Sequence, residues 1–234
     1  MSAMNPTLHH NLADRAKQIT QRELRTYVEK TPGSQAANTR AKKVLPLGVP
    51  SSLQAYDPHP IVIAKAQGAW MTDVDGNKLI DFSMGFGALF SGHVNPLVRK
   101  TIETQLDSGT LFVSPAEITA DVAELLRDRF GLPMWRFTNS GTESTMDAIR
   151  VARGVTGRDK IVKVEGGYHG HHDVVMVSQK PDLRFAGPAD NPLSVPSSAG
   201  VTDAVVHDTI VIPFNDADAL ERALSRNDVA CFIV

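Results

Sequence analysis

The first part of the chain has the pattern of one polar helix followed by extended segments. Residues 11–30 repeat apolar side chains at the spacing of one helix face, and Thr31-Pro32-Gly33 predicts the end of that helix. A loose stretch punctuated by prolines follows. Further on, apolar-rich runs flank Asp75-Gly76, a dipeptide typical of tight β-turns. The pattern therefore predicts a β-hairpin over residues 69–82.

The second part alternates apolar runs of strand length with amphipathic segments of helix length. Helices are predicted at residues 95–107, 116–130, 142–156 and 216–226, and strands at 134–138, 160–165, 174–177, 210–214 and 230–234. Residues 179–200, rich in Pro, Ser and Gly, are predicted as a long loop. Strands that alternate with helices predict an α/β fold, with a mixed, mostly parallel sheet and helices on both faces. Since no helix follows the last strand, we expect the sequence to stop within a domain.

Composition and charge exclude several classes of protein. The 234 residues are 42% hydrophobic with a formal net charge of −2, which fits a globular chain of one or two domains. No basic run stands out, so the charge pattern disfavours nucleic acid as a partner. The chain has no signal-peptide pattern and no apolar run near the ~18 residues of a membrane span. A single cysteine, Cys231, cannot form an internal disulfide, and together these features predict a cytoplasmic protein.

Residues 139–143, Asn-Ser-Gly-Thr-Glu, join a predicted strand to a predicted helix. Ser140 and Glu143 have the spacing of a capping box, and Gly141 lets a ligand approach the backbone closely. The free amide groups and the positive end of the helix dipole favour an anion there, and Thr142 adds a hydroxyl donor. The pattern indicates a phosphate site, although a plain capped helix explains the turn alone equally well.

A second cluster follows the next predicted strand. Residues 166–170 read Gly-Gly-Tyr-His-Gly, at the edge of the sheet where parallel strands present their carboxyl ends to ligands. Tyr168 can lay its ring on a flat heteroaromatic group, and His169 can orient a group beside it; a half-buried loop aromatic is the alternative for Tyr168. The run of His169, His171 and His172 also suggests a metal, but no carboxylate or cysteine set accompanies it at ligand spacing. We therefore expect no metal site.

The segment 137–173 resembles the cofactor segment of class III pyridoxal-phosphate-dependent aminotransferases. Within that family it is most similar to the glutamate-1-semialdehyde 2,1-aminomutase subgroup. The stretches that agree with it elsewhere are 45–56, 68–82, 90–96 and 194–201. The resemblance covers residues 40 to 234 and implies a truncated fold type I PLP-dependent transferase. It assigns residues 1–91 to an N-terminal helix, linker and β-hairpin of the small domain, and residues 92–234 to the first part of the large PLP-binding domain.

The resemblance implies a role for each residue of the two clusters. Ser140, Gly141 and Thr142 would bind the phosphate of pyridoxal 5'-phosphate. Tyr168 would stack on the pyridine ring, with His169 beside it. These five residues are the predicted cofactor site, and no residue of the chain is assigned a catalytic role.

The resemblance also implies roles in substrate binding, and it supports them less strongly. Ser51 would lie at the substrate carboxylate, and Phe86 stands where the aminomutases carry a tryptophan. The loop 179–200 matches a mobile gate of that subgroup. For each of these a purely structural role is the alternative. Gln54 departs from the pattern, because the aminomutases place there the arginine that pairs with the substrate carboxylate, and a glutamine cannot form a charged bidentate clamp.

The catalytic centre of the family lies outside the sequence. The Schiff-base lysine and the acidic partner of the pyridine nitrogen have no counterpart, and Lys160, Lys163 and Lys180 match no such motif. The leading hypothesis is a PLP-dependent aminotransferase of amino acids, which in the complete protein transfers the amino group through a lysine aldimine. The alternatives are the aminomutase itself and a truncated, non-catalytic chain that binds cofactor or a partner. The resemblance further implies a homodimer that acts on small-molecule substrates, an amino acid together with a keto acid or an aldehyde.

Overall fold

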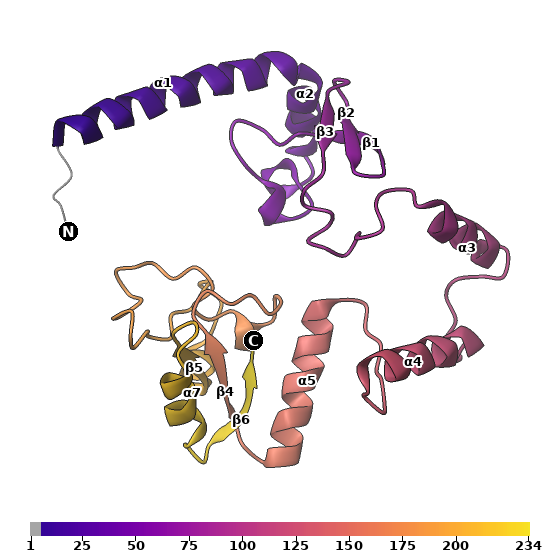
Figure 1. The fold of residues 1–234 in the computed structure, drawn as a ribbon, viewed down its shortest axis with the longest axis vertical. Helices are drawn as coiled ribbons and strands as arrows, with labels where there is room; N and C mark the ends of the chain where they lie inside the picture. Colours follow the sequence, from indigo (N-terminus) through magenta and orange to yellow (C-terminus); the bar gives the residue numbers. More distant parts are fainter. Residues whose placement is uncertain (1–5) are drawn as a thin grey trace. The chain divides into compact units, whose positions relative to one another are not determined.

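A computed structural model describes residues 6–234, with side chains from Leu12 onward. The chain forms two compact units (Figure 1), unit 1 up to Pro115 and unit 2 over Ala116–Val234. The predicted domain boundary between residues 91 and 92 stays a prediction.

Unit 1 begins with two consecutive helices, α1 (Pro6–Lys30) and α2 (Pro32–Ala41). The predicted end of α1 near Thr31 is confirmed, but the loose stretch expected after it is wrong, because Pro32 starts a new helix. Proline is favoured in the first turn of a helix, since its missing N–H has no intrahelical acceptor there anyway. The remaining helical elements of the unit are η1 (Pro46–Gly48), η2 (Ser52–Gln54) and α3 (Pro96–Leu106).

The predicted hairpin is the centre of an antiparallel sheet of order β1-β2-β3. Its strands are β1 (Ile63–Gln67), β2 (Trp70–Asp73) and β3 (Lys78–Ile80). The carboxylate of Asp73 stabilises the turn, because it accepts hydrogen bonds from the amides of Asp75, at 3.0 Å, and Asn77, at 2.7 Å. Asp75 in turn accepts from the amide of Gly33 at 2.6 Å, where its negative charge meets the N-terminus of α2.

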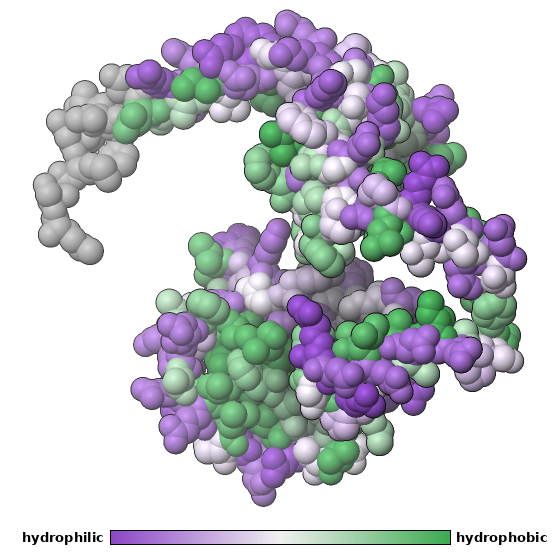
Figure 2. All heavy atoms as spheres, turned by 45° about the vertical axis from the view of Figure 1, so that its right-hand side comes forward, coloured by the Kyte–Doolittle hydropathy of each residue, from purple (hydrophilic) through white to green (hydrophobic). Residues whose placement is uncertain are grey.

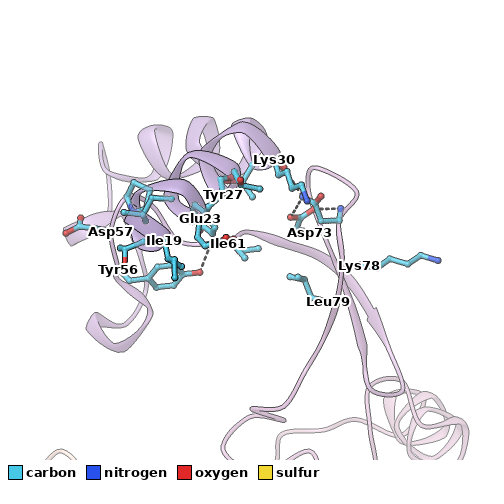
Figure 3. A pocket seen from close by; sticks show the side chains of 16 residues that line it. Ile19, Glu23, Tyr27, Lys30, Tyr56, Asp57, Ile61, Asp73, Lys78 and Leu79 are labelled. Atoms are coloured by element: carbon cyan, nitrogen blue, oxygen red, sulfur yellow. Dashed lines mark hydrogen bonds between the residues drawn. The ribbon is translucent and has the colours of Figure 1, made fainter. Parts of the chain in front are cut away.

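A groove lies between α1 and this hairpin (Figure 3). Ile19 and Tyr27 line it from α1, and Leu79 lines it from β3. The hydroxyl of Tyr27 donates to the carbonyl of His59 at 2.5 Å, which ties α1 to the segment before β1. Burial, together with the neighbouring hydroxyl of Tyr56, raises the pKa of Tyr27 above its ordinary value.

Unit 2 is built on a parallel sheet of order β5-β4-β6. The strands are β4 (Lys160–Val164), β5 (Thr209–Ile212) and β6 (Val229–Ile233), and the helical elements are α4 (Glu117–Phe130), α5 (Gly141–Thr156), η3 (Asp173–Val175), α6 (Asp203–Asp208) and α7 (Ala217–Leu224). Because successive strand residues face opposite sides, Val162 packs with α7 while Ile161 packs with Ile149 of α5 and Val175 of η3. The predicted α/β fold, with helices on both faces of the sheet, is confirmed.

Two expected strands of unit 2 are absent from the structure, and one helix was missed. Residues 134–138 form no strand, because no strand among residues 6–234 lies beside them to complete a ladder. Residues 174–177 are the 3-10 turn η3 followed by one isolated bridge, Val177 to Pro196. Their apolar pattern reflects full burial of Val175 and Val177 rather than a strand. The short helix α6 was not predicted.

Apolar side chains are exposed on unit 2. Figure 2 shows them, in green, on the visible face of this unit. Val155 at the end of α5 is 81% exposed, and Phe214 after β5 is 80% exposed. A groove beside α5 is lined by Val151, Val155 and Ala230 among others. Exposed apolar patches of this kind mark surfaces that pack against further protein.

Candidate cofactor site

The first turn of α5 is capped as its sequence predicts. Ser140 has an extended backbone, and its Oγ accepts a hydrogen bond from the amide of Glu143 at 3.2 Å. The Glu143 carboxylate reaches back to the amide of Asn139, at 2.7 Å, one residue before the cap. The two bonds hold the strand-to-helix turn in one geometry.

The cap leaves two amides of the turn free. Among residues 6–234, the N–H groups of Gly141 and Thr142 have no hydrogen-bond acceptor. A Cβ atom added at Gly141 would meet no atom within 4 Å, so the space beside this residue is open. Unpaired amides at the positive end of a helix bind anions. The turn can therefore accept a phosphate without displacing anything.

The turn that follows β4 lies directly against this cradle. Gly170 has a φ of +113°, and a Cβ atom there would lie 2.8 Å from the Cα of Thr142. The amide of His171 donates to Oγ1 of Thr142 at 3.1 Å. The structure thus brings together the two predicted clusters, Ser140–Thr142 and Tyr168–His169, which are more than twenty residues apart in sequence.

A residue that the sequence did not single out links the two clusters. Oγ1 of Thr145, one turn into α5, lies 2.6 Å from the carbonyl oxygen of His169 and 3.2 Å from Nε2 of His172. It also lies 3.1 Å from the carbonyl oxygens of Gly141 and Thr142. Thr145 follows Gly141 by four residues and Thr142 by three, which places it beside them on the helix. No other signal in the sequence pointed to Thr145, and none pointed to its contact with His169.

Tyr168 and His169 differ in their surroundings. The Tyr168 side chain is 62% exposed, so its ring is free to meet a ligand. His169 folds back over Gly167, and its Nε2 is buried without a hydrogen-bond partner in the described part of the chain. Burial, and then the positive charge of Lys163, hold the pKa of His169 below its ordinary value, which keeps the imidazole neutral. An unpaired buried nitrogen is costly, and a polar ligand group beside it would remove that cost.

The loop 179–200 has a closed stem. The amide of Ser178 donates to the carbonyl of Val195 at 2.7 Å, and the Ser178 hydroxyl accepts from the amide of Val195 at 2.9 Å. Ser197 donates to the carbonyl of Met176 at 2.9 Å. The predicted long loop is confirmed, since it contains no helix or strand. Its role as a gate stays a prediction.

The predicted substrate residues belong to unit 1. Ser51 is exposed and precedes η2, and its carbonyl accepts from the amide of Gln54 at 2.9 Å. Gln54 is exposed as well. Phe86 is 89% exposed and has a φ of +58°. These side chains are available to a ligand, and their relation to the cofactor site in unit 2 stays a prediction.

A hydrogen-bonded pair, Asp81 and His93, closes the base of the segment that carries Phe86. Oδ2 of Asp81 lies 2.8 Å from Nε2 of His93, and Oδ1 accepts from the amides of Ser83 and Met84, each at 2.9 Å. The Met84 amide, and then the His93 imidazole, hold the pKa of Asp81 below its ordinary value. The pair fixes both ends of the segment and was not found from sequence, because twelve residues separate its members.

Lys163 is fully buried on β4, and its Nζ donates to the carbonyl of Val177 at 2.6 Å. No group of three His, Cys, Asp or Glu side chains in residues 6–234 lies close enough to hold a metal ion. Over the same residues, no helix is long and apolar enough to cross a membrane.

The fold and the two joined turns define a fold type I PLP-dependent transferase. A sequence profile described as Aminotransferase class-III matches residues 52–234, and the chain belongs to that family. A glutamate-1-semialdehyde 2,1-aminomutase of Archaeoglobus fulgidus is 44% identical over 195 residues, which cover 83% of this chain and 45% of the relative.

Two solved structures are similar to the chain. An omega-transaminase from Sphaerobacter thermophilus has 37% identity and a TM-score of 0.82, over 88% of this chain and 48% of the other. A transaminase with PLP bound has 35% identity and a TM-score of 0.78, over 86% and 46%. The chain therefore spans about half the length of the relatives that it matches.

Proposed function

We propose that this chain forms the cofactor-binding part of a PLP-dependent aminotransferase that acts on amino acids. One observation carries the proposal: Gly170 packs on Thr142, so the free amides of α5 lie beside the turn that carries the exposed Tyr168. A phosphate and a flat aromatic ring joined by a short link fit such a pair of features. The similar transaminase with PLP bound supports this choice of ligand.

Each residue has a separate task in this proposal. The amides of Gly141 and Thr142 bind the phosphate, while Ser140 holds the turn through its cap. Tyr168 keeps the plane of the ring fixed, and neutral His169 offers Nε2 to a polar group at the ring's edge. When bound, PLP supplies an electron sink that lets an amino acid lose its α-proton. The chain's own contribution is to hold and orient that ring.

The choice between transaminase and aminomutase depends on Gln54. Relatives of both kinds support the family, since the Archaeoglobus protein is named an aminomutase and the Sphaerobacter protein an omega-transaminase. A neutral amide at residue 54 cannot pair with a carboxylate as an arginine does. We therefore favour a transaminase with a bulkier or β-amino acid as amino donor, and keep glutamate-1-semialdehyde 2,1-aminomutase as the second candidate.

Association with further protein is part of the proposal. The exposed apolar residues of unit 2, such as Val155 and Phe214, would be covered in the complete protein and its homodimer. A chain that binds cofactor without turnover is the remaining alternative. Spectroscopic detection of bound PLP in a protein that lacks transaminase activity would favour it.

Two glycines of α5 give a matched test of the phosphate cradle. A Cβ atom at either Gly141 or Gly154 meets nothing within 4 Å, so both tolerate substitution sterically. Gly141→Asp places a negative charge where the phosphate would lie, and we expect the Kd for PLP to rise roughly tenfold or more. Gly154→Asp, at the other end of the helix, should leave the Kd within about twofold. Equal affinities for PLP in both variants would refute the proposed cradle.

A further inference from the structure

Lys163 lies at a position where a charged side chain is unusual. It is 0% exposed, on the middle strand of the parallel sheet. Its partners across the two ladders, Val211 and Ile233, are both apolar. Burying an ammonium group is costly unless the group is bonded to something that needs it. A structural reason for this lysine must therefore lie in what its Nζ contacts.

The ammonium has one hydrogen-bond acceptor within residues 6–234, the carbonyl oxygen of Val177 at 2.6 Å. Val177 is itself fully buried and belongs to no strand, and among the residues that the structure describes its only ladder contact is the isolated bridge to Pro196. A side chain on the sheet thus holds a backbone segment that forms no ladder with the strands of the sheet. The lysine replaces the missing ladder with one side-chain hydrogen bond.

Val177 stands where the loop 179–200 leaves the body of unit 2. The next residue, Ser178, joins both ends of the loop through its bonds with Val195, and it has a φ of +48°. Its carbonyl accepts from the amide of Gly166 at 2.8 Å, at the start of the turn that carries Tyr168. The backbone fixed by Lys163 is therefore continuous with the loop stem and bonded to the turn of the cofactor site.

We propose that Lys163 is a positioning residue that latches the stem of the loop 179–200 onto the sheet and onto the turn bearing Tyr168 and His169. The proposal rests on the buried contact with Val177 and does not require that PLP binds. Opening of the stem would release the Val177 carbonyl and expose the ammonium to water.

This arrangement makes stem opening depend on pH in a defined direction. Burial lowers the pKa of Lys163 from 10.5 to about 8, and the carboxylate of Glu165 opposes the shift. Burial, and then the positive charge of Lys163, lower the pKa of the nearby His169. Burial also lowers the pKa of His172, where Asp173 opposes the shift and Arg153 adds to it. A hydrated lysine in the open stem would regain its ordinary pKa. At a pH between these two pKa values, Lys163 holds its proton in the open stem and has lost it in the closed stem. Because the closed stem therefore binds fewer protons than the open stem, rising pH favours the closed stem.

The test is amide hydrogen exchange of Ser178, Val195 and Ser197 in the complete, cofactor-free protein. After correction for intrinsic exchange, we expect the opening constant of the wild type to fall about tenfold or more between about pH 7 and about pH 9.5. Lys163→Met should abolish this slope. Lys180→Met, which removes an exposed lysine of the loop itself, should retain it.

Two results would overturn the proposal: a flat profile in the wild type, or an unchanged slope in Lys163→Met. If Lys163→Met does not fold, the Nζ titration of Lys163 in the wild type, followed by NMR, replaces it. A pKa near 8, with stem amides that gain protection over the same range, supports the latch. An ordinary lysine pKa, or stem protection that does not follow the titration, would contradict it.

Discussion

The hydroxyl of Thr145 lies 2.6 Å from the carbonyl oxygen of His169, across the junction between the first turns of α5 and the turn after β4. A hydroxyl has one hydrogen to donate, and the shorter contact identifies His169 as its acceptor. Oγ1 can at the same time accept from Nε2 of His172, at 3.2 Å, when that nitrogen carries a proton. The Thr145 side chain therefore helps to hold the phosphate cradle against the turn that carries Tyr168.

Removal of this hydroxyl should weaken cofactor binding. Thr145→Val keeps the side-chain shape and leaves the His169 carbonyl without its donor, which costs about 1 kcal/mol, or roughly fivefold in the Kd for PLP. Thr145→Ser should bind PLP with nearly the affinity of the wild type, because it retains the hydroxyl. The measurement is a titration of the cofactor-free protein with PLP, followed by absorbance. Equal affinities in the Val and Ser variants would show that the link does not position the cofactor.

The close packing of Gly170 on α5 predicts a large effect of a single methyl group. Gly170→Ala would place Cβ 2.8 Å from the Cα of Thr142, at a φ of +113°. Gly157 also has a positive φ, +66°, but a Cβ there meets no atom within 4 Å. Gly157→Ala should cost about 1 kcal/mol of unfolding free energy from backbone strain alone. Gly170→Ala should cost about 1–3 kcal/mol more, from overpacking.

Denaturant unfolding of the two alanine variants measures this difference. We also expect Gly170→Ala to weaken PLP binding, since the turn that carries Tyr168 must move away from α5. A Gly170→Ala variant as stable as Gly157→Ala would mean that the two turns are not in contact.

The sequence predicted the cap of α5, which involves residues close together in the chain. The other contacts of the site join residues far apart in the chain, and the sequence did not predict them. Ser140 and Glu143 are close in sequence, so their spacing alone predicted the cap that the structure confirms. The contact between Thr142 and His171 joins residues 29 apart, and the sequence of neither segment predicts it. The resemblance to the family placed Tyr168 and His169 in one site, but it did not identify Thr145.

The strand errors have a similar physical origin. An apolar run such as residues 134–138 fits a strand, but a strand requires a neighbour, and none is present among residues 6–234. The run 174–177 is apolar because Val175 and Val177 are both fully buried, and Val175 packs with Ile149 of α5 and Ile161 of the sheet. Lys163 was set aside because no catalytic motif surrounds it, and its contact with Val177 became visible only in the folded chain.

The proposed substrate preference predicts a gain of function at residue 54. Gln54→Arg would restore a charged donor for a substrate carboxylate, and a charge-assisted hydrogen bond is worth about 1.5–3 kcal/mol. We expect kcat/KM for glutamate-1-semialdehyde to rise roughly tenfold in the complete protein. Gln67→Arg adds the same charge on exposed β1 and should change nothing. If the wild type already converts this substrate efficiently, and Gln54→Arg does not improve it, the aminomutase becomes the better assignment.

The central claim is that the free amides at the start of α5 bind the phosphate of PLP. The most direct measurement is a crystal structure of the complete protein with PLP bound. The account predicts phosphate oxygens at hydrogen-bond distance from the amide nitrogens of Gly141 and Thr142, with the pyridine ring against Tyr168. A phosphate bound elsewhere, with both amides left to solvent, would contradict it.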